Sequence, residues 1–180
     1  MISISGYQIL EQLYDGSRTL VYRAIREVEQ KPVIIKILKN SHPDFNELLQ
    51  FRNQYTIAKN LDIPGIVLPY SLEPYQNSYA LVMEAFGCVS LYEYMLWRNI
   101  ASLEDVLSIT VKISNILYNL HQNRVIHKDI KPANILINPE TKEVKIIDFS
   151  ISSLLPKETQ QIKNPNGLEG TLPYISPEQT

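Results

Sequence analysis

Cysteine is almost absent from this sequence, since Cys88 is the only one among 180 residues. A single thiol cannot form a disulfide within the chain, and no second cysteine stands at the spacing of a metal-binding pair. The sequence therefore excludes a disulfide scaffold and a cysteine-based zinc site. We expect Cys88 to be a buried, unreactive thiol rather than a reactive one.

Long apolar runs and a strong excess of one charge are also missing. No stretch approaches the roughly 18 apolar residues that a membrane helix needs, and the first seven residues have neither the basic region nor the apolar core of a signal peptide. The formal net charge is −2 and the pI is about 5.9, which argues against broad binding to nucleic acid or anionic membranes. We expect a cytoplasmic protein with no membrane insertion and no nucleic-acid partner.

The composition is that of a globular protein with a real core. Hydrophobic residues make up 44% of the chain and charged residues 20%, and a chain of this length predicts one domain, which can have two lobes. Apolar and β-branched segments predict strands at residues 7–13, 20–25, 32–38, 66–72 and 79–83, with a helix at 45–61 between the third and fourth.

The second half of the chain predicts a more helical region. Ser102 and Asp105 form the pattern of a helix-capping box, and an apolar stripe continues to about Gln122. Short apolar runs at 134–137 and 144–147 follow, and the polar segment 155–170 is expected to be an exposed loop. The fold class is thus α+β, with a strand-rich first part. The expected buried stripe of the helix is Leu103, Val106, Leu107, Thr110, Ile113, Leu117 and Leu120.

Residues 127–134, His-Lys-Asp-Ile-Lys-Pro-Ala-Asn, have the chemistry that phosphoryl transfer requires. That reaction needs positioning and charge neutralisation more than covalent help. Asp129 can face an incoming hydroxyl, Lys131 can meet phosphate oxygens, and Asn134 can supply an oxygen ligand to Mg²⁺. The alternative is an ordinary polar surface turn around Pro132.

Two further charged residues support this interpretation. Asp148 follows the apolar run Val144–Ile147 and carries the hard oxygen that Mg²⁺ prefers, although an acid at a strand end is common in itself. Lys36 interrupts the apolar run 33–37, where a charge is costly without a partner. The alternative for Lys36 is an edge-strand lysine that reaches solvent.

In their order and spacing these motifs resemble those of eukaryotic-type serine/threonine protein kinases. Asp148-Phe149-Ser150 is similar to the magnesium motif of that family, and residues 170–178, Gly-Thr-Leu-Pro-Tyr-Ile-Ser-Pro-Glu, are similar to the end of its activation segment. Met83 to Phe86 stand where the family's hinge would be. The sequence of residues 51–55 and 176–180 also resembles that of the N-terminal kinase domains of bacterial multi-domain sensor kinases.

The resemblance implies a two-lobed kinase-like fold and a role for each matched residue. It implies an N-lobe at 1–84, a hinge at 85–90 and a partial C-lobe at 91–180. The C-lobe is called partial because the helical lobe of the family normally continues past the Ser-Pro-Glu motif. A lobe that is cut short there is expected to leave apolar surface exposed. ATP and Mg²⁺ are the implied cofactors, a protein with serine or threonine the implied substrate, and sensor or signalling domains of a longer parent protein possible partners. The implied catalytic residues are Asp129 and Lys131, the metal ligands Asn134 and Asp148, and the ATP-binding residues Lys36, Gly16, Val21, the Glu84 carbonyl and the Phe86 amide.

The sequence departs from the family pattern at several positions. Tyr14 and Thr19 replace two glycines of the glycine-rich loop, which would hinder close approach of the backbone to phosphates. Gln54 stands where a glutamate normally pairs with the lysine, so we expect Lys36 to be held loosely. Lys128 replaces an arginine that grips a phosphorylated loop, which makes control by phosphorylation doubtful. Thr159 is a candidate phosphorylation site by position alone, and Thr171 is expected to be structural, near the catalytic loop.

Two other function classes stay open on the sequence alone. The altered glycine loop and Gln54 are compatible with a non-catalytic, pseudokinase-like binding module, whereas the intact Asp129, Asn134 and Asp148 favour catalysis. A kinase of small molecules shares the acid-to-asparagine loop, but Lys131 and the segment 170–178 favour protein substrates.

Overall fold

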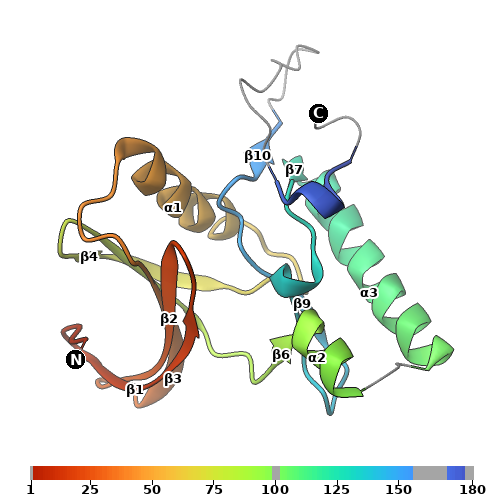
Figure 1. Cartoon of the computed structure of the whole chain (residues 1–180), viewed down its shortest axis with the longest axis horizontal. Helices are drawn as coiled ribbons and strands as arrows, with labels where there is room; N and C mark the ends of the chain where they lie inside the picture. The colour runs from red at the N-terminus through yellow and green to blue at the C-terminus, as the bar shows by residue number, and fades with distance from the viewer. Residues whose placement is uncertain (1, 99–101, 156–169, 177–180) are drawn as a thin grey trace. The chain divides into compact units, whose positions relative to one another are not determined.

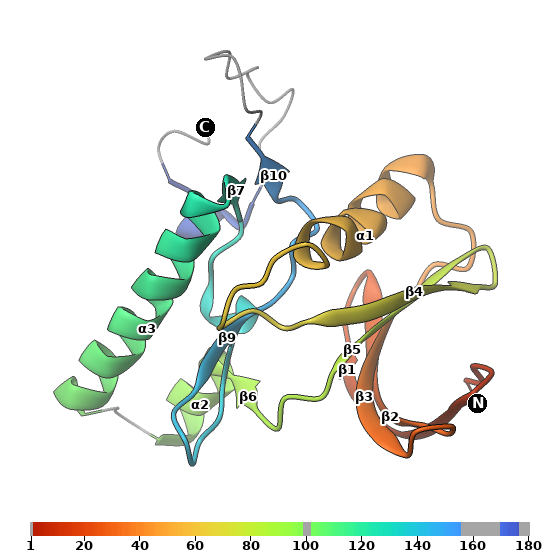
Figure 2. The same cartoon turned by 180° about the vertical axis from the view of Figure 1, so that it is seen from behind.

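The computed structural model describes residues 2–98, 102–155 and 170–176 (Figures 1 and 2). The chain divides into two compact units. The first consists of Met1–Lys59 and Val67–Phe86, and the second of Asn60–Ile66 and Gly87–Thr180. The α+β fold class and the strand-rich first part are confirmed, since the first unit is built on one sheet with one helix.

The first unit contains a five-stranded antiparallel sheet in the order β1-β2-β3-β5-β4. Residues of β3 alternate between its two faces, so Val33, Ile35 and Ile37 are buried on one face while Lys36 lies on the other. This buried face forms the core together with Tyr22, Ala24, Ala80 and Val82. The strands are β1 (Tyr7–Asp15), β2 (Thr19–Arg26), β3 (Lys31–Leu38), β4 (Pro69–Tyr75) and β5 (Ser78–Glu84).

The two edges of this sheet are connected by a side-chain contact. The Tyr7 hydroxyl on β1 donates a hydrogen bond of 2.6 Å to Glu73 on β4, and Ser71 donates to the same carboxylate oxygen. Burial, followed by the hydrogen bond to Glu73, raises the pKa of Tyr7 above its ordinary value. Because β1 and β4 lie at opposite ends of the strand order, the sheet curves around its core.

Helix α1 (Phe45–Ala58) packs against β4 and β5 (Figure 2). A capping box begins it, because Asp44 accepts from the Glu47 amide at 2.8 Å and the Glu47 side chain accepts from the Asp44 amide. The helix ends at Ala58, three residues before the predicted end at 61, where the chain passes to the second unit.

Within its described residues, the second unit contains short strands, two α-helices and two short 3₁₀ helices. Its elements are β6 (Val89–Ser90), α2 (Leu91–Arg98), α3 (Leu103–Gln122), β7 (Val125–Ile126), η1 (Pro132–Asn134), β8 (Ile135–Ile137), β9 (Val144–Ile146), β10 (Ser153–Leu154) and η2 (Leu172–Tyr174). Strands β6, β8 and β9 form one sheet, and β7 pairs with β10. Ser102 caps α3 by accepting from the Asp105 amide, as its sequence predicts.

Residues 60–66 belong to the second unit although they follow α1 directly. Ile66 forms a parallel bridge with Ile146 of β9, and the Ile146 amide donates to the Gly65 carbonyl at 2.8 Å. The predicted strand 66–72 is therefore displaced: Ile66 pairs within the second unit, and the strand of the first unit is β4, from Pro69 to Tyr75.

The predicted apolar stripe of α3 is buried only in part: Leu120 is buried as expected, whereas Leu103, Val106, Leu107 and Thr110 are exposed. Ile109, Ile116 and Leu120 are the buried residues, and they face β9 and β7. Apolar residues cover more than one face of this helix, so spacing alone did not identify the packed side. The exposed apolar residues of α3 are Leu103, Val106, Leu107, Val111 and Tyr118.

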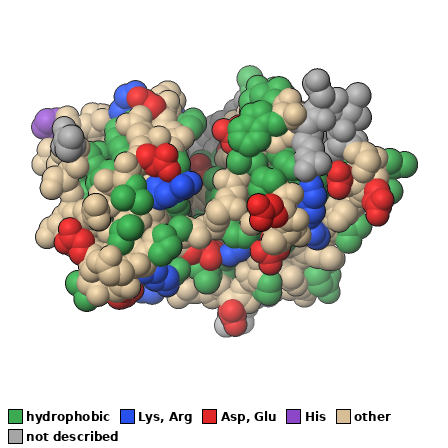
Figure 3. Space-filling model, turned by 90° about the horizontal axis from the view of Figure 1, so that it is seen from below, with side chains coloured by type: hydrophobic (Ala, Val, Ile, Leu, Met, Phe, Trp, Pro, Cys, Tyr) green, Lys and Arg blue, Asp and Glu red, His purple; other side chains and the backbone are tan. Residues whose placement is uncertain are grey.

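Helix α2 adds exposed apolar side chains, including Met95, Leu96 and Trp97. Hydrophobic side chains also reach the surface on the face drawn in Figure 3, where charged side chains lie among them. Among the described residues, no helix is both long enough and apolar enough to cross a bilayer.

Gly65 gives a direct test of how the segment 60–66 packs on α3. Its φ is +97°, and a Cβ would lie 2.4 Å from Ile116 Cγ1. We expect Gly65→Ala to lower the free energy of unfolding by about 2 kcal/mol or more, from left-handed strain and overpacking together. Gly87→Ala is the matched control, since a Cβ there meets nothing within 4 Å. Urea unfolding of both variants measures the difference, and equal stabilities would contradict the packing described.

Candidate active site

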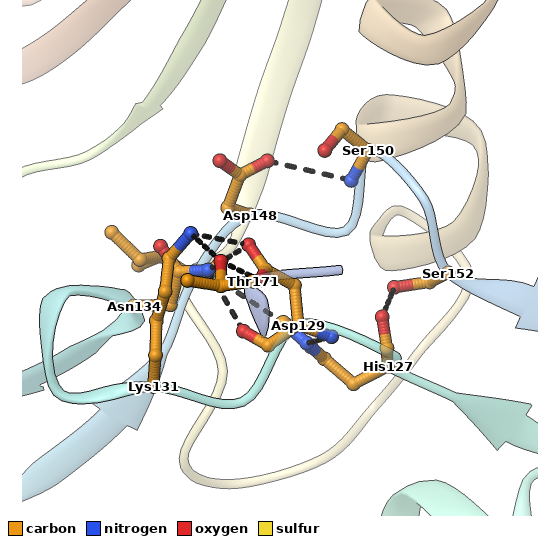
Figure 4. A network of polar contacts seen from close by, with 9 residues as sticks. His127, Asp129, Lys131, Asn134, Asp148, Ser150, Ser152 and Thr171 are labelled. Atoms are coloured by element: carbon orange, nitrogen blue, oxygen red, sulfur yellow. Dashed lines mark hydrogen bonds and ion pairs between the residues drawn. The ribbon is translucent and has the colours of Figure 1, made fainter. Parts of the chain in front are cut away.

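The segment between β7 and β8 brings the predicted catalytic residues together around the Asp129 carboxylate (Figure 4). Lys131 Nζ lies 2.7 Å from Asp129 Oδ2. Asn134 Nδ2 donates to the same oxygen at 2.8 Å and to the Asp129 carbonyl at 2.9 Å. The turn η1 positions Asn134, which is buried. Asp129, Lys131 and Asn134 thus form one bonded cluster.

Thr171 also belongs to this cluster, which confirms its expected structural place near the catalytic loop. Its hydroxyl donates to Asp129 Oδ1 at 2.6 Å and accepts from Lys131 Nζ at 2.7 Å. Gly170 allows this approach, because its φ is +124° and a Cβ would lie 3.0 Å from the Lys128 carbonyl oxygen. The Gly-Thr pair was visible in the sequence, but its partners lie about 40 positions away and no local pattern connects them.

Asp148 lies beside Asn134 because the preceding residue pairs with it. The Ile147 amide donates to the Asn134 carbonyl at 3.0 Å, and Asp148 follows with a φ of +70°. Its carboxylate accepts from the Ser150 amide at 3.4 Å, as Figure 4 shows. Ser150 is not among the residues with positive φ, so its backbone does not require the glycine found in the family motif.

The oxygens of Asp148 and Asn134 are suitable ligands for Mg²⁺, which binds one or two protein carboxylates and completes its shell with water and phosphate. Within the described ranges, no group of three or more His, Cys, Asp and Glu residues could hold a metal by itself. A magnesium ion here would therefore depend on phosphate oxygens for part of its coordination.

His127 connects the catalytic segment to the strand before Asp148. The Asp129 amide donates to His127 Nδ1 at 3.3 Å, so Nε2 carries the proton and donates to the Ile147 carbonyl at 3.0 Å. The ring packs edge-on against Phe149, with centroids 4.9 Å apart. Burial lowers the pKa of His127 from its ordinary value of 6.5, which keeps the ring neutral and this tautomer intact.

Lys36 and Val21 lie in the first unit as cross-strand partners on β3 and β2. Lys36 Nζ donates to Gln54 Oε1 of α1 at 2.9 Å. A hydrogen bond of this length is ordinary, so the loose hold expected from an uncharged partner is not what the geometry shows. Lys36 therefore has the partner that a charge in an apolar strand requires.

The β1–β2 hairpin holds Gly16 at its tip, where the sequence lacks two of the family's glycines. The Tyr14 ring lies directly over Gly16, since a Cβ there would be 2.4 Å from Tyr14 Cε1. Lys39, which follows β3 directly, binds the tip of the hairpin. It forms an ion pair with Asp15, and its amide donates a hydrogen bond to the Arg18 carbonyl. This ion pair lowers the pKa of Asp15.

The predicted adenine-binding residues lie at the end of β5 and just beyond it. Glu84 pairs with Val33, and its amide and side chain both bond to the backbone of Leu68. These bonds occupy the Glu84 amide and carboxylate. Phe86 is the last residue of the first unit.

Several predicted features lie outside the described residues. These are most of the expected loop 155–170, the candidate phosphorylation site Thr159, and Pro177 and Glu178 of the Ser-Pro-Glu motif.

Comparison with known proteins identifies close relatives of the sequence. The protein kinase domain family matches residues 7–180. The chain is 36% identical to the serine/threonine-protein kinase PrkC of Bacillus subtilis over 98% of this chain and 27% of that protein. It is 31% identical to a probable serine/threonine-protein kinase, pknA2, of Bifidobacterium longum over 96% and 23% of the two chains. With the Drosophila melanogaster serine/threonine-protein kinase fused, identity is 27% over 97% and 21%. The chain spans about a quarter of the length of these relatives.

The buried neutral state of His127 predicts a loss of stability in acid. The folded pKa lies below the unfolded value of 6.5, so the unfolded chain binds the proton first and the free energy of unfolding falls as pH drops below 6.5. Each pKa unit between the two states corresponds to about 1.4 kcal/mol.

Denaturant unfolding between pH 7.5 and pH 5 measures this effect. His127→Phe should flatten the pH dependence, whereas His42→Asn, at an exposed position, should leave it unchanged. An equally steep dependence in His127→Phe would show that another group is responsible.

Proposed function

The chain belongs to the eukaryotic-type serine/threonine protein kinases, and we propose that it transfers the γ-phosphate of ATP to serine or threonine hydroxyls of protein substrates. The observation that supports this most directly is the environment of Asp129. Its carboxylate has donors on both oxygens, from Lys131, Asn134 and Thr171, which fixes its orientation before any substrate arrives.

Each residue of the cluster has a role that follows from its charge and position. Asp129 accepts a hydrogen bond from the incoming hydroxyl and orients it, and Lys131 stabilises charge on the transferred phosphoryl group. Thr171 restricts both side chains to one arrangement, because its hydroxyl bridges them. Preorganised groups of this kind lower the barrier without moving during the reaction.

The ATP-binding residues are assigned on the same basis. We propose that Asn134 and Asp148 hold Mg²⁺, which neutralises phosphate charge when bound, and that Lys36 binds the α- and β-phosphates. Val21 shares a face of the sheet with Lys36, which suits contact with the nucleotide, and Gly16 lies in the phosphate-covering hairpin. The Glu84 carbonyl and Phe86 amide are the proposed adenine contacts.

A non-catalytic binding module is the second candidate, and one observation favours it. Tyr14 covers Gly16, which limits how closely the hairpin backbone can approach phosphates. The bonded cluster around Asp129 favours catalysis instead, because catalysis requires an oriented carboxylate and binding alone does not.

The setting of the protein is also a proposal. A cytoplasmic location fits a chain whose only cysteine cannot form an internal disulfide and whose reaction uses ATP. The relatives are about four times longer than this chain, so we propose that sensor or signalling domains accompany this kinase domain in a longer parent protein.

Nucleotide binding should depend on magnesium and on Asp148. At a Mg·ATP concentration a hundred times its Kd, binding adds about 2.7 kcal/mol to the stability of the folded chain. We expect a rise in Tm with ATP and Mg²⁺ that disappears with a chelator and in Asp148→Asn. Asp62→Asn, at an exposed position of the same unit, is the control. A rise of equal size in Asp148→Asn would remove Asp148 from the site.

Phosphate transfer should depend on Asp129. A correctly placed base contributes about 10²- to 10⁴-fold to the rate, so Asp129→Asn should lower kcat by at least about 10²-fold while it still binds Mg·ATP. Transfer of ³²P to a mixture of protein substrates measures this. An unchanged rate would refute the assignment, and phosphorylation of small alcohols but no protein would indicate a small-molecule kinase.

A further inference from the structure

The tip of the β1–β2 hairpin has two hydroxyl side chains, Tyr14 and Thr19, where protein kinases have glycines. In that family the glycine-rich loop covers the phosphates of ATP with its backbone. Gly16 is the one glycine that this loop keeps, and its amide donates to the Thr19 carbonyl at 3.0 Å. The hairpin therefore already uses this amide to close its own turn.

Both side chains lie on the face of the sheet that carries Lys36. Tyr14 on β1 lies opposite Val21 on β2, and Val21 lies opposite Lys36 on β3. Directly opposed residues of antiparallel strands point to the same face, and Thr19, two residues before Val21, does so as well. Leu20, between them, packs instead against the buried core on the other face. The two hydroxyls thus share a face with the residue proposed to bind the α- and β-phosphates.

Neither hydroxyl has a hydrogen-bond partner among the residues that the structure describes. Tyr14 is 57% exposed, and Thr19 is partly exposed. The hydroxyl end of the Tyr14 ring lies over Gly16, since a Cβ there would be 2.7 Å from the hydroxyl oxygen. The ring therefore brings an unused O–H group to the tip of the hairpin, where the backbone alone would otherwise face a ligand.

We propose that Tyr14 and Thr19 bind the phosphates of ATP through their hydroxyl groups, in place of the backbone contacts that the missing glycines would allow. This inference rests on the proposed function. Each hydroxyl is a hydrogen-bond donor, and a donor bonds more strongly to an ionised acceptor such as phosphate than to a neutral one. A side chain also extends beyond the backbone, so it reaches an anion that the covered backbone of Gly16 cannot approach closely.

The bonds that hold the hairpin tip suit binding through side chains. Lys39 forms an ion pair with Asp15, and its amide donates to the Arg18 carbonyl at 2.8 Å. These two bonds connect both sides of the tip to the chain just after β3. Tyr14 and Thr19 flank the tip, so the backbone that carries their hydroxyls is fixed before a ligand arrives, which lowers the entropy cost of binding.

The first test removes the hydroxyls alone. We expect Tyr14→Phe and Thr19→Val each to raise the Kd of Mg·ATP about three- to tenfold, because each variant loses one hydrogen bond to a charged group and keeps its shape. The Kd of adenosine, which has no phosphate, should stay unchanged. Titration calorimetry on the full chain measures both, with Tyr118→Phe, at an exposed position of α3, as the control. An unchanged Kd for Mg·ATP in either variant, or an equal loss for adenosine, would overturn the proposal.

Substitution by the family's own residues distinguishes binding by the hydroxyls from simple obstruction. If Tyr14 and Thr19 only kept the backbone away from phosphates, Tyr14→Gly/Thr19→Gly would bind Mg·ATP more tightly than the parent, and Tyr14→Phe/Thr19→Val would bind it equally well. We expect instead that Tyr14→Phe/Thr19→Val binds at least about tenfold more weakly than the parent. The glycine variant should show no tightening, because glycine adds backbone freedom that binding must restrict. Tighter binding by the glycine variant, with no change in Tyr14→Phe/Thr19→Val, would refute the role of the hydroxyls.

The parent chain separates failure of this inference from failure of the kinase assignment. Binding of Mg·ATP and phosphate transfer by the parent test the proposed function, whereas the comparison with Tyr14→Phe tests only the hydroxyl. A parent that transfers phosphate, with variants of equal Kd, would contradict the inference and leave the function in place. A parent that binds no nucleotide would contradict both. Because neither hydroxyl has a described internal partner, urea unfolding of Tyr14→Phe and Thr19→Val should give midpoints close to that of the parent, which excludes loss of folded protein as the cause of a weaker Kd.

Discussion

The second unit depends on the ion pair and the hydrogen bonds that the Asp129 carboxylate forms. The Asp129 side chain is 13% exposed and that of Lys131 25%, so both charges are partly removed from water and need partners. Those partners come from two parts of the chain: Lys131 and Asn134 from the same segment, and Thr171 from beyond β10. Satisfying one carboxylate therefore fixes the course of two segments that are far apart in sequence.

Backbone strain lies next to this carboxylate. Lys128 and Asp148 adopt φ values of +68° and +70°, a region that residues other than glycine seldom occupy. Strained conformations persist where the surroundings determine them, and here the surroundings are bonds of the same network. His127 accepts from the Asp129 amide and donates to Ile147, which holds the residues on either side of the strained positions. The bonds of His127 therefore stabilise the strained backbone at both positions.

Much of the fold could be predicted from the sequence, since the five strands of the first unit and both long helices have clear periodicity or caps. The side on which α3 packs could not, because apolar residues such as Leu107 and Ile109 lie on nearly opposite sides of the helix, and only the packing against β9 and β7 distinguishes them. Strands β8 and β9 coincide with the two short apolar runs of the sequence. Strands β6, β7 and β10 and helix α2 escaped prediction because they have too few residues for a period. In the site, Asp129, Lys131 and Asn134 share one local motif. The family resemblance placed Thr171 near them, but its bonds to Asp129 and Lys131 are seen only in the fold, where distant segments meet.

The departures from the family pattern have different physical consequences. Ser150 replaces a glycine at a position with no left-handed backbone, so its side chain costs nothing in conformation. Tyr14 replaces a glycine whose absence does matter, because its ring fills the space above Gly16. Gln54 replaces a charged partner with an amide that still accepts a hydrogen bond from Lys36. The three substitutions are therefore not equivalent: the first is neutral in conformation, the second restricts close approach of the hairpin backbone, and the third keeps the bond to the lysine. Because their consequences differ, the number of lost motif residues is a poor measure of lost function.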